Sequence, residues 1–113
     1  MGIFSTQQFL VSASFATTGS PMSIPGGVSP LANLTIQTSS ASLASQTMNF
    51  EATVNGTDYT PVQMTNLTTG TAASQTVGTG EEIWRMNVAG LNKVRLNLSA
   101  ISGCQTAVGK LVI

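Results

Sequence analysis

The amino-acid sequence predicts an all-β protein, an antiparallel β-sandwich that is jelly-roll-like and has about eight short strands. Apolar and polar residues alternate in run after run along the 113 residues, which is the pattern of half-buried strands. Turn-forming residues separate these runs at spacings of about ten residues, as in sandwiches and jelly rolls. No run carries the apolar stripe of an amphipathic helix.

One domain with a short N-terminal arm is expected. A chain of 113 residues and 11.6 kDa can bury about two thirds of its unfolded surface without metals or disulfides. Neither a linker nor an internal repeat divides it. Ile3 and Phe4 are apolar but belong to no alternating run. We therefore expect an arm over residues 1–8 and a single β-sandwich domain over residues 9–113.

The N-terminal part of this domain is expected to supply two strands and at most a short edge strand between them. Residues 9–15 alternate as the first. Proline and glycine between residues 21 and 30 exclude a central strand and leave an edge strand near residues 22–24. Alternation resumes over residues 31–38. Residues 39–46 are rich in Ser and Ala without an apolar stripe, so a loop is favoured over a weak helix.

A hairpin is expected in the middle of the chain. Residues 47–54 alternate strictly and run into Asn55-Gly56, the dipeptide best suited to a type I′ turn because both central residues must accept positive φ. The return strand over residues 59–64 contains Pro61, which donates no backbone hydrogen bond. This strand is therefore expected at a sheet edge or a bulge.

The C-terminal part is expected to add four strands. Residues 72–76 form a short one within a Thr- and Gly-rich stretch, and residues 81–89, 93–100 and 105–113 form three longer ones. Trp84, the only tryptophan, could anchor an interface. Its alternation with neighbouring apolar residues favours burial inside the sandwich instead.

The composition argues against electrostatic partners. Charged residues make up 7% of the chain, against about 25% in typical soluble domains. Four basic residues balance four acidic ones, so nothing attracts nucleic acid or an anionic membrane. The first residues do not have the pattern of a secretory leader, a basic segment followed by an apolar one, and no apolar run approaches about 20 residues, so neither a leader nor a membrane span is expected. We expect a soluble protein made in the cytoplasm.

The chain offers little for catalysis or cofactor binding. Cys104 has no disulfide partner, and without histidine the usual zinc ligand sets are lacking, so we expect no metal and no cofactor. Cys104 is expected to be a small buried residue rather than a nucleophile. The carboxylates are Glu51, Asp58, Glu81 and Glu82. Glu51 and Asp58 could converge across the hairpin, but nothing marks a substrate pocket, so we do not expect an enzyme.

Two segments within the C-terminal two thirds resemble small β-sandwich proteins encoded among bacteriophage and prophage virion genes. The first is Phe50-Glu51 followed by Asn55-Gly56-Thr57-Asp58-Tyr59-Thr60-Pro61. The second is Trp84-Arg85-Met86-Asn87-Val88-Ala89-Gly90-Leu91-Asn92-Lys93-Val94-Arg95-Leu96, followed by Leu98-Ser99-Ala100-Ile101-Ser102-Gly103. Asn55 stands where Asp is usual in those proteins, and Tyr59 where Trp is usual. These differences weaken any role of that turn in ligand recognition.

This resemblance implies a virion structural component without enzymatic activity. Members of this type are head decoration proteins, or fibre and tail modules. A stand-alone domain with a short apolar arm resembles a capsid decoration (cement) protein more than a fibre, so decoration is favoured. A tail, neck or fibre-associated host-binding module is the alternative. Because cement proteins usually act as small oligomers, the implied partners are the major capsid protein or other virion proteins, and further copies in a homo-oligomer, with a trimer favoured.

Six residues are candidates for partner binding. Ile3 and Phe4 lie near an untethered end, where strand or arm addition to a partner is favourable. Phe9 either joins them or lies in the core. Carbohydrate binding by exposed aromatic rings is a further possibility, but Tyr59 is the only plausible platform, and a single ring rarely suffices.

The other three candidates are basic. If residues 81–89 and 93–100 pair as a hairpin, Arg85, Lys93 and Arg95 share one outward face. That face could engage carboxylates of a neighbouring subunit. A solvated strand face without a partner is the alternative.

Overall fold

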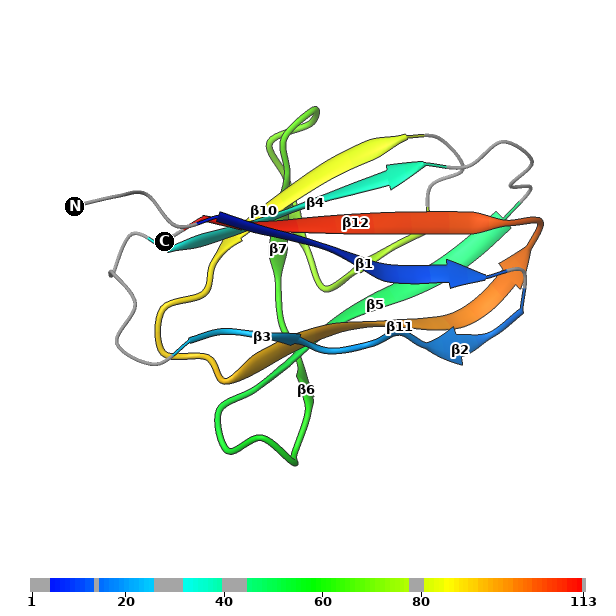
Figure 1. Cartoon of the computed structure of the whole chain (residues 1–113). Helices are drawn as coiled ribbons and strands as arrows, with labels where there is room; N and C mark the ends of the chain where they lie inside the picture. Colours follow the sequence, from blue (N-terminus) through cyan, green and yellow to red (C-terminus); the bar gives the residue numbers. More distant parts are fainter. Residues whose placement is uncertain (1–4, 14, 26–31, 40–44, 78–80, 113) are drawn as a thin grey trace.

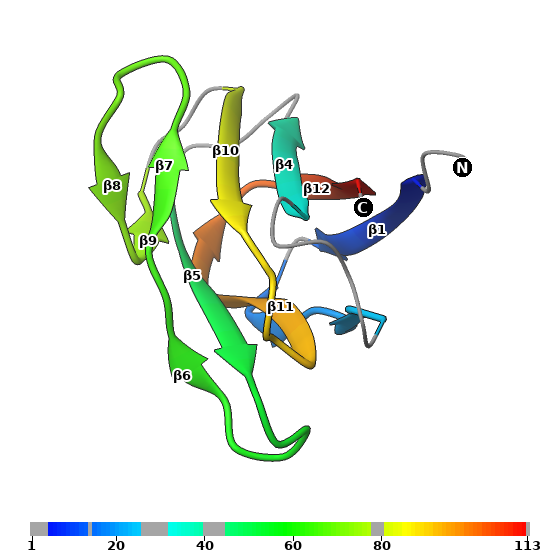
Figure 2. The ribbon, with the colours of Figure 1, turned by 90° about the vertical axis from the view of Figure 1, so that its left-hand side faces the viewer.

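The fold is a sandwich of two antiparallel sheets, seen from one end in Figure 2. The computed structural model describes residues 5–13, 15–25, 32–39, 45–77 and 81–112, and of Ser5, Thr6 and Phe9 it describes the backbone alone. Every regular element within these residues is a β-strand. None of them belongs to a helix long and apolar enough to cross a bilayer.

The strands differ greatly in length. The long strands are β1 (Ser5–Ala13), β4 (Asn33–Ser39), β5 (Ser45–Thr53), β10 (Glu82–Asn87), β11 (Lys93–Ser102) and β12 (Gln105–Val112). The short ones are β2 (Thr17–Thr18), β3 (Met22–Ser23), β6 (Thr60–Pro61), β7 (Met64–Asn66), β8 (Ala72–Ala73) and β9 (Gln75–Thr76). The long and short strands together outnumber the expected eight. One reason is that the strand expected over residues 72–76 is divided into β8 and β9.

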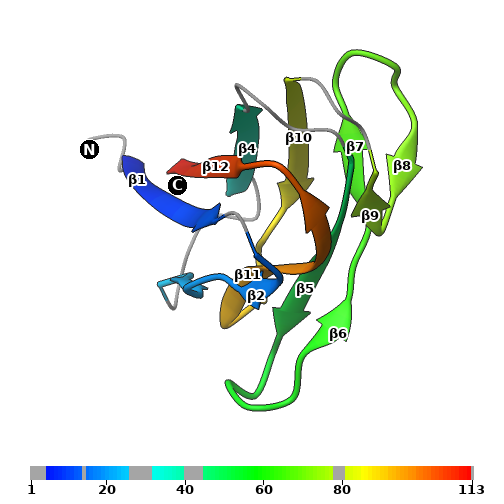
Figure 3. The same ribbon diagram turned by 90° about the vertical axis from the view of Figure 1, so that its right-hand side faces the viewer.

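The strand order is that of a jelly roll (Figures 1 and 3). Sheet A has the order β1-β12-β4-β10-β7-β8, and sheet B has the order β2-β11-β5-β6, with β3 also on β11 and β9 on β5. Strands from the two ends of the chain pair in succession: β1 with β12, β2 and β3 with β11, β4 with β10, and β5 with β6. Successive pairs alternate between the sheets, as when one long hairpin rolls up. The expected jelly-roll-like sandwich is confirmed.

The core lies between the sheets and follows the predicted alternation. Strands β4, β5 and β11 supply its centre through the fully buried side chains of Leu34, Ile36, Met48, Phe50, Val94, Leu96 and Leu98. Trp84 on β10 is also buried, so its assignment to the core is confirmed. Its ring centroid lies 5.0 Å from that of Phe50 at an interplanar angle of 54°, a tilted contact that adds to the effect of burial.

Two edge positions follow the prediction. β3 lies at Met22–Ser23, and β6, which contains Pro61, ends the order of sheet B. Pro61 has no backbone N–H to donate, and at the edge of the sheet no further strand needs this hydrogen bond. Of the loop expected over residues 39–46, residues 40–44 lie outside the described part of the chain, whereas Ser45 and Gln46 belong to β5.

The first strand differs from the prediction at both ends. β1 begins at Ser5, so residues 5–8, expected in the arm, pair with β12 because their backbone extends the sheet whatever their side chains. A register shift at Leu10 marks a bulge, and Leu10 and Val11 are both buried. Beyond β1, Phe15 is 66% exposed rather than inward. The bulge brings both Leu10 and Val11 inward, which strict alternation does not allow, and Phe15 is exposed because β1 ends at Ala13.

The expected type I′ turn is also wrong. Gly56 has a φ of 89°, but Asn55 does not have the positive φ that this turn requires. The side-chain oxygen of Asn55 instead accepts hydrogen bonds from the backbone N–H groups of Thr57 and Asp58, both at 2.9 Å. β5 ends before Val54, which is 71% exposed rather than inward. An Asx-type turn therefore closes this loop.

Candidate interaction surfaces

A charged cluster lies on the outer face of sheet B. Glu51 on β5 is directly opposite Arg95 on β11, and Arg95 Nε donates to Glu51 Oε1 at 2.7 Å. Asn97 Nδ2 donates to the other carboxylate oxygen at 3.3 Å. The guanidinium carbon of Arg95 also lies 3.7 Å from the centre of the Tyr59 ring. The Arg95–Glu51 ion pair is the only one among the described side chains. The guanidinium of Arg95 also covers one face of Tyr59.

The basic residues expected on one face lie on two different sheets. Lys93 and Arg95 are two residues apart on β11 and share the outer face of sheet B. Arg85 lies on β10 in sheet A, where its Nε donates to Thr35 Oγ1 at 3.2 Å. The prediction of one shared basic face is wrong, because the chain crosses between the sheets after β10 instead of forming a hairpin.

A shallow groove of about 420 Å³ lies on the outer face of sheet A. A cross-strand row forms its centre: Lys110 lies opposite both Gln7 and Thr35, and Thr35 lies opposite Arg85. The remaining lining residues are Gln37, Ile83, Val108 and Val112. Lys110 was not a sequence candidate, because its strand neighbours are apolar and its place beside Arg85 depends on the register of three strands.

A half-buried carboxylate links two short strands to β10. Glu82 Oε1 accepts hydrogen bonds from the Thr76 hydroxyl and, at 3.4 Å, from Trp84 Nε1. Its Oε2 accepts one from Asn66 Nδ2 at 3.4 Å. The three donors, Thr76, Trp84 and Asn66, are uncharged and buried. Through them Glu82 joins β7, β9 and β10. Its contacts are those of a structural residue.

Two other carboxylates are also engaged by neighbouring side chains. The Glu51 carboxylate is bound by Arg95, and Asp58 Oδ2 accepts a hydrogen bond from Asn55 Nδ2 at 2.7 Å. The described residues contain no group of three or more Cys, Asp or Glu that could hold a metal ion. Cys104 is exposed rather than buried, because it lies in the turn between β11 and β12.

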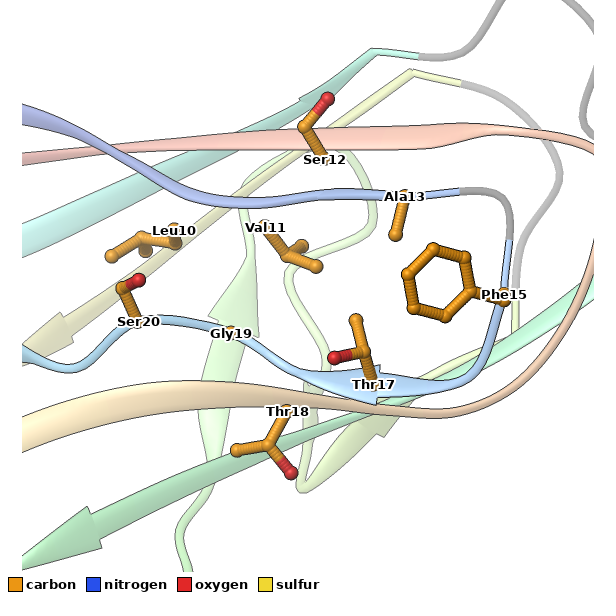
Figure 4. A pocket seen from close by; sticks show the side chains of 9 residues that line it. All are labelled: Leu10, Val11, Ser12, Ala13, Phe15, Thr17, Thr18, Gly19 and Ser20. Atoms are coloured by element: carbon orange, nitrogen blue, oxygen red, sulfur yellow. The ribbon is translucent and has the colours of Figure 1, made fainter.

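A second hollow, of about 330 Å³, lies at the corner between β1 and β2 (Figure 4). Its polar lining residues are Ser12, Thr17, Thr18 and Ser20. The side chains of Ser12 and Thr18 point away from the space between β1 and β2 (Figure 4). The ring of Phe15 lies beside Ala13 at this corner and is largely exposed. Tyr59, the ring expected as a platform, is stacked against Arg95, so Phe15 is the more accessible ring. Sequence alternation did not indicate an exposed ring, because Phe15 continued an apparently inward series.

The apolar candidates near the N-terminus have no described side chains. Ile3 and Phe4 lie outside the described residues. The backbone of Phe9 lies in β1 opposite Val108, but its side chain is outside the described set. Arm docking through Ile3 and Phe4, and a core or docking role for Phe9, stay predictions.

Two solved structures share this fold. YomS, a protein derived from the SPBc2 prophage, matches with a TM-score of 0.85 and 25% identity over 100% of this chain and 96% of its own. The exported protein XepA of PBSX matches with a TM-score of 0.86 and 17% identity over 100% of this chain. The chain spans 39% of the XepA chain. A comparison with curated proteins finds no match.

A match to a family model shows family membership, which a shared fold alone does not. The model of the family described as XepA matches residues 7–111, which include nearly all of the described strands. Together with the two structural neighbours, it confirms the resemblance to small prophage-derived β-sandwich proteins. The chain belongs to the XepA family.

Proposed function

We propose that this protein is a non-enzymatic structural component of a phage particle, most specifically a capsid decoration (cement) protein that binds and stabilises the assembled head. Phage association is supported by its family and by the prophage origin of YomS and XepA. The observation that carries the structural role is a complete jelly roll whose strand carboxylates, Glu51 and Glu82, are both engaged in contacts between strands.

The fold supports a role in an assembly by analogy. Jelly rolls recur in viral capsid and lectin domains, although a fold alone does not determine function. Sheet faces with few charges can pack closely against a neighbour without desolvating many ions. A protein that binds only the assembled lattice stabilises that lattice by mass action.

The proposed partners follow from this role. They are the major capsid protein or other virion proteins, together with further copies of this chain in a homo-oligomer, for which a trimer is favoured. The location is the virion. The mass of the purified protein in solution, measured by light scattering during gel filtration, tests the oligomeric state. A mass of three times 11.6 kDa would support the trimer, and any other multiple would contradict it.

The experiment that tests the function is a count of copies per purified particle, made by quantitative mass spectrometry against the major capsid protein. Hundreds of copies would support a decoration protein that covers the lattice. A small multiple of three, six or twelve would contradict decoration and place the chain on the neck, tail or fibres. Its absence from particles would contradict the virion role altogether.

A tail, neck or fibre-associated host-binding module is the second candidate, and one observation favours it. The hollow beside Phe15 combines an exposed ring with the hydroxyl groups of Thr17 and Ser20 (Figure 4), a combination suited to stacking on a sugar ring and hydrogen bonding to its hydroxyls. If this candidate is correct, Phe15→Ala should abolish adsorption of the purified protein to host cells, whereas Val54→Ala, at another exposed apolar site, should not.

A further inference from the structure

We propose that the groove on the outer face of sheet A, with Arg85 and Lys110 at its centre, is the surface through which this protein binds an acidic protein surface on the phage particle. This inference rests on the proposed function and specifies the contact by which it is exerted. It differs from the sequence prediction, which grouped Arg85 with the two cations of β11.

The register of sheet A places the groove residues in rows across four adjacent strands. The central row is Gln7, Lys110, Thr35 and Arg85. The next row includes Val108, Gln37 and Ile83, and Val112 lies on the opposite side of the central row. Ile83 and Val112 are each 38% exposed. Lys110 is therefore flanked by Val108 and Val112, whereas Arg85 has Ile83 on one side and Asn87 on the other.

The charges of this face are not balanced within the described structure. Neither Arg85 nor Lys110 belongs to an ion pair there, in contrast to Arg95, which is bound by Glu51. No acidic residue lines the groove. Glu81, which immediately precedes β10, is exposed but is not part of the lining. The groove thus carries two positive charges that carboxylates of a partner could neutralise.

The combination fits a protein better than a polyanion. Binding to nucleic acid or to an anionic membrane relies on many cations, with each phosphate contact adding to a salt-dependent total. This groove has two cations separated by Thr35, and three aliphatic side chains, Ile83, Val108 and Val112, lie beside them. Protein interfaces combine an apolar contact with a few charged pairs in this way. The predicted partner surface therefore bears two carboxylates beside apolar residues.

The test measures attachment to phage particles that lack this protein. Such particles, prepared from a phage with its gene deleted, are mixed with purified protein and sedimented over a range of protein concentrations. Arg85→Glu/Lys110→Glu should weaken attachment by about a hundredfold or more, because it places like charges at the contact. Arg85→Gln/Lys110→Gln, which only removes the charges, should weaken it less. Lys93→Glu, on the outer face of sheet B, is the matched control and should attach normally.

The outcomes separate the inference from the proposed function. If the wild-type chain attaches and Arg85→Glu/Lys110→Glu, folded by circular dichroism, attaches equally well, the groove is not the contact. An equal loss with Lys93→Glu would also overturn the inference. A lower oligomeric mass of the double variant would overturn it as well, because the groove would then be an interface between copies of this chain. The same holds if the wild type sediments with phosphatidylglycerol vesicles and the double variant does not, because the groove would then bind an anionic membrane. Failure of the wild type itself to attach would instead overturn the proposed function, and the inference with it.

Discussion

Gly19 passes directly against the carbonyl oxygen of Leu10, at the bulge of β1. The backbone N–H of Gly19 donates to the carbonyl of Leu96 at 2.8 Å, which holds it against sheet B, while Leu10 belongs to sheet A. Figure 4 shows the two segments side by side. A Cβ at position 19 would lie far inside van der Waals contact with the Leu10 oxygen. The two sheet edges therefore meet at a position that only glycine fits.

Gly19→Ala should lower the free energy of unfolding by about 3 kcal/mol, because the backbone atoms it meets cannot rotate away. Urea unfolding followed by tryptophan fluorescence measures the change. Ser20→Ala, at the exposed neighbouring position, is the control and should change stability by less than about 0.5 kcal/mol. Equal stability of the two variants would show that the edges separate freely.

Asn55→Asp should destabilise the loop after β5 by about 1 kcal/mol. Aspartate keeps the acceptor for the N–H groups of Thr57 and Asp58 but loses the donor that binds Asp58 Oδ2 at 2.7 Å, and it brings two carboxylates together. Thermal unfolding by differential scanning calorimetry measures the loss. Adding Asp58→Asn should restore most of the stability, and a double variant no more stable than Asn55→Asp would contradict the explanation.

Gln105→Leu should cost about 1–3 kcal/mol. Gln105 on β12 and Gln46 on β5 are both buried, and Gln105 Nε2 donates to Gln46 Oε1 at 2.6 Å across the two sheets. The substitution removes this donor while leaving the buried amide of Gln46 in place. Chemical unfolding of both single variants and of Gln46→Leu/Gln105→Leu forms a double-mutant cycle. A double variant with the summed losses of the singles would show that the pair is not coupled.

Arg95→Ala should cost about 1 kcal/mol, since it removes both the ion pair with Glu51 and the stacking on Tyr59. The value is modest because the two charged side chains remain 28% and 15% exposed, where solvent screens their attraction. Lys93→Ala, which has no ion pair within the described part of the chain, is the comparison and should be nearly neutral. Urea unfolding at low and high salt should show a difference between the variants that narrows as salt rises.

The sequence by itself determined most of the strands and the side each residue faces within them. Met48 and Phe50 in β5, and Val94 and Leu96 in β11, are buried as alternation predicts. This succeeds because the pleat of a strand is local: neighbouring side chains point to opposite faces whatever the partner strand. The lack of histidine and the balanced charge were likewise readable without coordinates.

The tertiary structure alone decided which strands pair and hence which side chains meet. Arg85 joins Lys110 rather than Lys93 because β10 and β12 both pair with β4, a contact between segments far apart in sequence. The bulge in β1 buried Leu10 as well as Val11, and the end of β1 at Ala13 left Phe15 exposed. Alternation constrains one strand at a time, whereas pairing and register are set by the joint burial of all strands, so the candidate surface became visible only in the folded sandwich.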